Sequence, residues 1–168
     1  PAGREFAIRN ADYLFRNIPT PERGREDVAH VHEQSKALGR DVGVFTNAYV
    51  VCRPTTKEAE EYHQYYAVDH ADTEAVDRMF IGRGIRDDPT LSDEVKTAMW
   101  RRIAAGNSAY PLIGTPDEVV AKMQELSDMG VSGIAMGLVN YTEHFPCFRD
   151  EVLPRLERAG LRKEVANA

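Results

Sequence analysis

The pattern of apolar and polar positions is clearest over residues 112–139, where it predicts a helix followed directly by a strand. Thr115 and Glu118 have the spacing of a capping box, and apolar residues then recur every three or four positions. Gly130 can adopt the left-handed conformation that ends a helix. The apolar run from Val131 to Val139 is short enough for a strand buried on both faces. A helix leading into such a strand is typical of a parallel sheet in an α/β fold.

The same order of elements recurs along the rest of the chain. We predict helices over residues 1–11, 21–38, 56–66 and 141–159, and strands over 13–15, 42–52 and 131–139. Pro154 lies inside the last of these helices and should kink or divide it. Residues 68–110 show helical patterns and no buried strand, so we interpret them as a helical insertion of the kind that forms lids or binding loops. The sequence thus predicts three parallel strands with a helical insertion.

Composition narrows the class of protein. The chain has 168 residues, of which 42% are hydrophobic and 29% charged, as in an ordinary globular domain or a piece of one. The net charge of -6 argues against a nucleic-acid partner, because such proteins usually carry a basic face. No apolar run reaches the roughly 18 residues that span a bilayer, and the first residues lack the apolar core of a signal peptide.

Two cysteines, Cys52 and Cys147, lie far apart in the sequence and fit no metal or redox spacing. No histidine pairs with a cysteine at ligand spacing either, so we predict no metal site. A reducing cytoplasm is the simplest setting for such a chain. The first residue is Pro1 rather than Met, and we interpret the chain as a fragment of a longer protein.

The first turn of the opening helix is a candidate anion site. Unpaired backbone N–H groups at a helix start can hold a phosphate, and Arg4 could assist. The alternative is an ordinary helix start with a solvated arginine.

Four segments resemble the bacterial luciferase-like flavin monooxygenases, most closely the alkanesulfonate, long-chain alkane and pyrimidine monooxygenase branches. They read PAGREFAIRNADYLF, GRDVGVFTNAYVVCRPTTKEAEEY, LIGTPDEVVAKMQELSDMGVSGIAMGLVNY and FRDEVLPRLERAGLR. The resemblance implies the C-terminal half of a TIM (β/α)8 barrel, from its fifth helix to its eighth strand and helix. Residues 1–168 would then form a partial barrel domain with 68–110 as its insertion, since a whole barrel needs about 250 residues.

The resemblance also implies where a flavin phosphate would lie. In the family, the segment up to and including Pro1 to Arg4 lies at this phosphate, usually after a serine that is not in this sequence. Ala2, Gly3 and Arg4 are therefore the candidate cofactor-binding residues.

The active face of such a barrel lies at the carboxyl ends of its strands. Asn140 and Tyr141 are candidates for the pocket wall, and Arg53 could face an anionic substrate. The alternatives are a solvated loop residue for Arg53 and a strand-ending turn residue for Asn140. His144 is the catalytic candidate, because histidine is a general base near neutral pH, and its alternative is a simple helix-start residue.

The resemblance implies an enzyme that uses reduced FMN, supplied by a separate flavin reductase, and O2 to oxygenate a small organic substrate. It would work in the cytoplasm as a homo-oligomer, and this fragment alone could be inactive. One alternative is hydride transfer with a flavin or deazaflavin, as in other members of the superfamily. Another is a non-catalytic half barrel that self-associates through its open sheet edges. The sequence identifies no substrate.

Overall fold

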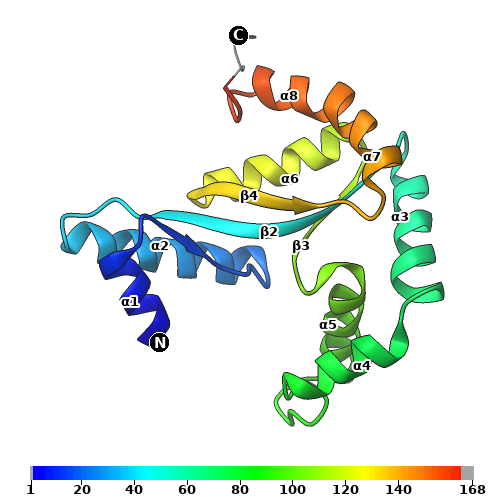
Figure 1. Cartoon of the computed structure of the whole chain (residues 1–168), viewed down its shortest axis with the longest axis horizontal. Coiled ribbons are helices and arrows are strands. Elements are labelled where there is room, and N and C mark those ends of the chain that lie inside the picture. Colours follow the sequence, from blue (N-terminus) through cyan, green and yellow to red (C-terminus); the bar gives the residue numbers. More distant parts are fainter. Residues whose placement is uncertain (1, 164–168) are drawn as a thin grey trace.

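The computed structural model describes residues 2–163, and four strands within this range form one parallel sheet (Figure 1). The strands are β1 (Tyr13–Phe15), β2 (Gly43–Cys52), β3 (Tyr110–Gly114) and β4 (Val131–Gly137). The α-helices are α1 (Ala2–Asn10), α2 (Pro21–Ala37), α3 (Thr56–Gln64), α4 (Thr73–Gly82), α5 (Asp93–Gly106), α6 (Pro116–Asp128), α7 (Tyr141–Cys147) and α8 (Leu153–Arg158). Two π-helical turns, η1 (Tyr65–Asp69) and η2 (Phe148–Val152), continue α3 and α7.

Strand β2 is the centre of the sheet, and every other strand pairs with it. Val44 has Leu14 of β1 and Val131 of β4 as partners, so β1 and β4 lie on opposite edges of β2. Ala48 likewise lies between Tyr110 of β3 and β4, which places β3 on the same edge as β1, further along the strand. β2 is also the longest of the four strands, with ten residues, which lets it pair with all three of the others.

The parallel α/β fold is confirmed, but the predicted number of strands, three, is corrected to four. β3 has only five residues and includes Pro111, which cannot donate a ladder hydrogen bond. The segment also leads directly into the Thr115 cap, so the sequence analysis treated it as the approach to the helix and not as a strand. Pairing of residues 110–114 with the end of β2 makes it a strand, which is a tertiary effect.

The outer face of the sheet carries the main core. Val44, Ala48 and Val50 of β2 point to this face and pack against apolar side chains of α2, α6 and η2. Those partners are fully or nearly fully buried: Val28, Val31, Val119, Met123, Leu126, Phe148 and Val152. The apolar stripe predicted for the helix after Thr115 therefore faces the sheet.

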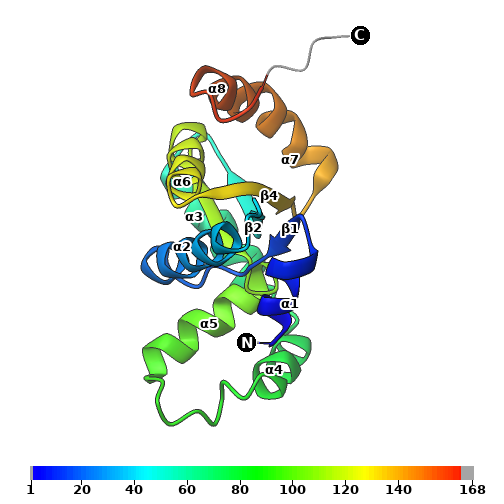
Figure 2. The ribbon, with the colours of Figure 1, turned by 90° about the vertical axis from the view of Figure 1, so that its left-hand side faces the viewer.

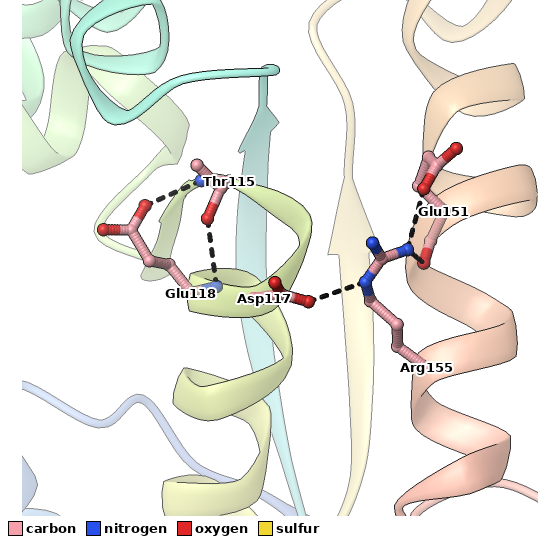
Figure 3. A network of polar contacts seen from close by, with 5 residues as sticks. All are labelled: Thr115, Asp117, Glu118, Glu151 and Arg155. Atoms are coloured by element: carbon pink, nitrogen blue, oxygen red, sulfur yellow. Dashed lines mark hydrogen bonds and ion pairs between the residues drawn. The ribbon is translucent and has the colours of Figure 1, made fainter.

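The capping box of α6 forms as predicted. The Thr115 hydroxyl accepts from the Glu118 backbone N–H at 3.3 Å, and the Glu118 carboxylate accepts from the Thr115 N–H at 2.8 Å (Figure 3). Asp117 in the same turn accepts from Arg155 of α8, which also binds Glu151. This network ties the start of α6 to the last helix.

The last predicted helix is divided, as Pro154 suggested. It forms α7, the π turn η2 and α8, with Pro154 in the first turn of α8. Proline lacks the N–H that an uninterrupted α-helix needs at this position, and a local π turn is one way in which a helix accommodates such a break.

The insertion contains the helices α4 and α5. It has a small hydrophobic core of its own, formed by Val76, Phe80, Ile85 and Ile103. Figures 1 and 2 show this pair of helices on the opposite side of the sheet from α7 and α8. Arg102 of α5 attaches it to the rest of the chain. Its Nη2 donates to the carbonyls of Ile18, Ser108 and Ala109 at 3.0 to 3.2 Å, which joins the loop after β1 to the loop before β3.

The inner face of the sheet is partly open. Tyr13 and Phe15 of β1 are 62% and 56% exposed, and both rings contact Phe45 of β2. Further along β2, Tyr49 and Val51 are covered by α3, η1 and α5. Only the half of this face nearest the strand ends is therefore buried within the described part of the chain.

Candidate functional site

Three side chains from separate elements meet where β2 ends. Arg53 follows the strand, Tyr62 belongs to α3 and His144 to α7. The Arg53 Nη2 lies 2.9 Å from the His144 Nε2, and its guanidinium carbon lies 4.1 Å from the centre of the Tyr62 ring. The Tyr62 and His144 rings meet edge to face, with 5.0 Å between their centroids. We call this group the Arg53 cluster, and it brings together two of the predicted site residues.

The cluster requires a neutral His144. A guanidinium can only donate hydrogen bonds, so the His144 Nε2 accepts from Arg53, and the His144 Nδ1 lies 3.4 Å from the backbone N–H of Asn140, which is also a donor. Because both ring nitrogens face donors, the doubly protonated ring is disfavoured. Burial, to 8% exposure, is the main cause that lowers the pKa of His144 below 6.5. The Arg53 charge lowers this pKa further, while Glu143 partly opposes the shift. His144 is thus an uncharged acceptor near neutral pH.

Asn140 and Tyr141 lie at the start of α7. The Asn140 side chain caps this helix: its Oδ1 accepts from the Thr142 hydroxyl at 2.8 Å and from the Glu143 N–H at 3.4 Å. This is the turn role proposed as the alternative for Asn140. Tyr141 is 62% exposed. The place of both residues in a pocket wall stays a prediction.

The candidate phosphate residues lie at the other end of the sheet from α3 and α7 (Figure 1). Ala2 and Gly3 are exposed in the first turn of α1, and no atom lies within 4 Å of the position that a Gly3 side chain would occupy. Arg4 lies 3.6 Å from Asp27, whose other carboxylate oxygen accepts from Arg16 at 2.8 Å. Two guanidinium groups thus share one carboxylate beside the helix start, and Glu5 adds a second carboxylate to the same first turn.

A hollow of about 420 Å³ lies on the inner face, beside the middle of β2 and the carboxyl end of β4. It is bounded by β2, the end of α5, and β4 with the loop that follows it. Its lining residues are Asn47, Ala48, Tyr49, Ala105, Gly106, Asn107, Ala109, Ala135, Met136, Gly137, Leu138 and Val139. The insertion therefore supplies part of the wall of this hollow.

Tyr49 links the hollow to α3, which the sequence did not predict. Its hydroxyl lies 3.4 Å from the His63 Nε2, and the two rings are stacked. Burial raises the pKa of Tyr49 to about 12 and lowers the pKa of His63 below its usual value. The spacing of tyrosines on α3 was visible in the sequence, but their partner on β2 was not.

The two cysteines, which lie far apart in the sequence, come together in the structure. Cys52 is buried at the end of β2, and Cys147 ends α7. Burial and the neighbouring Cys147 thiol raise the pKa of Cys52 to about 12. Both are free thiols. No signal in the sequence spacing pointed to this pair.

Within residues 2–163, no group of three or more His, Cys, Asp or Glu side chains is arranged to hold a metal ion. None of the helices in this range combines the length and hydropathy required of a membrane span.

The parallel strands, the helices on their outer face and the polar side chains at the strand ends define part of a (β/α) barrel. The sequence profile of the luciferase-like monooxygenase family matches residues 1–133. The chain belongs to this family, and the resemblance found in the sequence is confirmed.

Comparison with known proteins agrees with this membership. The chain is 26% identical over 169 residues to an FMNH2-dependent dimethylsulfone monooxygenase of Pseudomonas fluorescens, covering 98% of this chain and 46% of the relative. The crystal structure of DmoA from Hyphomicrobium sulfonivorans superposes with a TM-score of 0.82 at 20% identity, covering all of this chain and 42% of that one.

A coenzyme F420-dependent tetrahydromethanopterin reductase from Methanopyrus kandleri is more distant. It has a TM-score of 0.57 at 18% identity, with 90% of this chain and 47% of that one covered. The chain therefore spans about half the length of the proteins it matches, and the fold is that of a partial TIM barrel.

Proposed function

We propose that this chain is the C-terminal part of an enzyme that uses reduced FMN and O2 to oxygenate a small organic substrate. The observation that carries the proposal is the family match over residues 1–133, together with a relative that depends on FMNH2. In this proposal, residues 1–168 are one partial barrel domain, and residues 68–110 are the insertion that helps to cover the substrate.

The residues present fit the phosphate end of FMN. The first turn of α1 carries the N–H groups of Ala2, Gly3 and Arg4, with open space around Gly3, and the guanidinium groups of Arg4 and Arg16 lie beside it on Asp27. We infer that Ala2, Gly3 and Arg4 bind the phosphate. Reduced FMN, when bound, supplies the electrons that activate O2, and the protein supplies positioning and a dry site.

The Arg53 cluster and the start of α7 form the strand-end wall of the proposed pocket, with Arg53, Asn140 and Tyr141 as its polar members. His144 is the proposed general base. Its Nε2 accepts from Arg53 and its Nδ1 faces the Asn140 N–H at 3.4 Å, so His144 can take a substrate proton only when one of these donors moves away. Because its pKa is lowered, the neutral, proton-accepting form is available at neutral pH.

The proposed function also implies partners. A flavin reductase would supply reduced FMN, the assembly would be a homo-oligomer, and the enzyme would work in the cytoplasm on a small molecule rather than on nucleic acid or at a membrane.

The proposal is tested on the full-length protein that contains this chain. FMN binding is measured by quenching of flavin fluorescence, and O2 uptake and product are measured with a reductase that supplies FMNH2, with dimethyl sulfone among the substrates offered. Arg4→Ala should weaken FMN binding about tenfold, the loss of roughly one charge-assisted hydrogen bond. Arg9→Ala, on the same helix but in its last turn, is the matched control. Wild-type protein that binds no FMN would contradict the proposal.

The same assay distinguishes the alternatives. Hydride transfer is favoured only by the more distant reductase structure, and it predicts substrate reduction without O2 uptake. A non-catalytic half barrel predicts neither flavin binding nor turnover, and association of copies through the exposed Tyr13 and Phe15 face.

A further inference from the structure

Cys52 and Cys147 are the two cysteines of the chain, and the structure places them side by side as free thiols. Cys52 ends β2, Cys147 ends α7, and the Cys147 side chain contacts the Cys52 thiol. The neighbouring residues show independently that these two segments meet. Arg53, directly after Cys52, donates to His144, which lies less than one helical turn before Cys147, at 2.9 Å. Tertiary packing therefore builds a pair of thiols from segments distant in the sequence.

The pair lies on the other face of the sheet from the hollow. Cys52 belongs to the main core on the outer face, and Cys147 packs against the same core. Neither residue lines the hollow on the inner face. Within residues 2–163, no third His, Cys, Asp or Glu side chain joins the two thiols in an arrangement that could hold a metal ion. The chemistry open to the pair is therefore that of two thiols with each other.

The two thiols differ in their access to solvent. Cys52 is 5% exposed, whereas Cys147 is half-buried. Burial raises the pKa of Cys52 to about 12, although the nearby Arg53 and Arg155 charges partly oppose this shift. A dissolved oxidant therefore reaches Cys147 first, and Cys52 is placed to react with Cys147 rather than with the oxidant. An accessible cysteine beside a second, resolving cysteine is the arrangement found at redox-sensing sites.

We propose that Cys147 and Cys52 form a redox site, at which hydrogen peroxide converts the two thiols to a disulfide. The Cys147 sulfur attacks one peroxide oxygen, the O–O bond breaks, and Cys147 sulfenic acid and one water form. The Cys52 sulfur then attacks the Cys147 sulfur, so that the S–S bond forms and the S–O bond breaks. The hydroxide leaves as a second water with the Cys52 proton. The two thiols thus lose two electrons and two protons, and the peroxide is reduced to two waters.

The disulfide has a structural consequence at the Arg53 cluster. It joins the end of β2 covalently to α7, next to the contact between Arg53 and His144. Because it closes a loop that contains most of the chain, it also removes conformational freedom from the unfolded state. Thiol reductants reverse the bond by thiol–disulfide exchange, so the site records exposure to peroxide. This inference does not depend on the proposed oxygenase function, because it needs neither flavin nor substrate.

The test uses full-length protein that has been reduced, freed of reductant and treated with hydrogen peroxide. Peptide mapping by mass spectrometry identifies linked peptides, and a parallel sample contains dimedone, which labels sulfenic acids. The wild type should give a linked pair of peptides that contain Cys52 and Cys147. Cys52→Ala removes the resolving thiol, so dimedone should label Cys147. In Cys147→Ser, the matched control, Cys52 should stay a free thiol without a dimedone label.

A second measurement needs no variant. Peroxide treatment should raise the thermal unfolding temperature of the wild type by about 5 °C, and dithiothreitol should reverse the rise. Neither single-cysteine variant should show it.

Three outcomes would overturn the proposal. They are folded wild-type protein that forms no linked peptide, linkage of Cys52 or Cys147 to some other cysteine instead, and dimedone labelling of Cys52 in Cys147→Ser. Failure to bind FMN contradicts only the oxygenase, since the peroxide experiment is carried out without flavin.

Discussion

At the scale of single residues, the protonation of His144 is the feature that the structure adds to the sequence. Its imidazole is buried against Tyr62 and accepts from Arg53 at 2.9 Å, so a proton on Nε2 would face a guanidinium donor. The neutral form is stabilised by folding, which makes the contacts of this cluster depend on pH.

The first prediction follows from this pKa. Because the pKa of folded His144 lies below the unfolded value of 6.5, the unfolded chain binds more protons between those two values. The free energy of unfolding should be highest above pH 6.5 and fall as the pH is lowered, by no more than about 1.4 kcal/mol per pH unit for this group. Urea unfolding of the full-length protein at pH 7.5 and 5.5 measures it.

His144→Gln should reduce this dependence and leave the part that His63 contributes, since the pKa of His63 is also lowered by burial. His30→Gln, on the exposed face of α2, is the control and should keep the wild-type slope. An unchanged slope in His144→Gln would contradict the neutral state inferred for the cluster.

Thr46 gives a second prediction at this scale. Its side chain is fully buried on the helix-covered face of β2, and its hydroxyl has no partner within the described chain. A buried hydroxyl without a hydrogen bond is costly, and valine has nearly the same shape. Thr46→Val should therefore raise the free energy of unfolding by about 1 kcal/mol. Chemical denaturation measures the change. A loss of stability in Thr46→Val would show that the hydroxyl has a partner.

At the scale of elements, side chains at the helix starts satisfy backbone N–H groups and fix where the helices begin. Both predicted capping boxes form, at Thr55 with Glu58 and at Thr115 with Glu118. The Glu118 carboxylate also accepts from the Thr56 hydroxyl at 3.0 Å, which connects the starts of α3 and α6. These bonds lower the pKa of Glu118, so the stabilisation by its carboxylate is complete above the usual pKa of 4.5 and is lost as the pH falls through the lowered pKa of the folded protein.

The third prediction concerns this cap. Thr115→Ala removes the oxygen that accepts from the Glu118 N–H, and it should cost about 1 kcal/mol of stability (Figure 3). Thr115→Ser keeps the oxygen and should restore most of the loss. The measurement is the shift in thermal unfolding temperature of the three proteins. Equal stability of the alanine and serine variants would mean that the cap contributes nothing here.

At the scale of the whole molecule, the inner face of the sheet is the face whose apolar side chains are only partly covered. Tyr13 and Phe15 both contact the half-buried Phe45 but are themselves largely uncovered, while the outer face carries the main core. In a complete barrel the interior is filled by side chains from all strands. We therefore expect the rest of the full-length protein to cover this face.

The fourth prediction tests that expectation. Tyr13→Asp should destabilise the full-length protein by about 3 kcal/mol or more, because a charge would be buried in the barrel. Phe6→Asp is the matched control: Phe6 is 69% exposed, but it lies on α1 away from the inner face. Unfolding by urea compares the two. Similar small losses in both would show that the inner face stays open to water.

Much of this fold could be predicted from local sequence. The helix starts at Thr20, Thr55 and Thr115 follow from side-chain oxygens that bond to backbone three residues on, and β2 and β4 follow from apolar runs. The family resemblance, carried by such segments, is confirmed as well. The phosphate and pocket residues remain predictions, because the half of the barrel that would test them is not in this chain.

The amino-acid sequence by itself determined the helices, three of the four strands and the family, because those depend on periodicity and on contacts between residues close in the chain. Only the tertiary structure decided that β3 is a strand, that Cys52 meets Cys147 and that Arg53 bonds to His144. It also placed Asn107 of the insertion in the wall of the hollow beside Asn47. Each of these is a contact between segments distant in sequence, which no local pattern encodes.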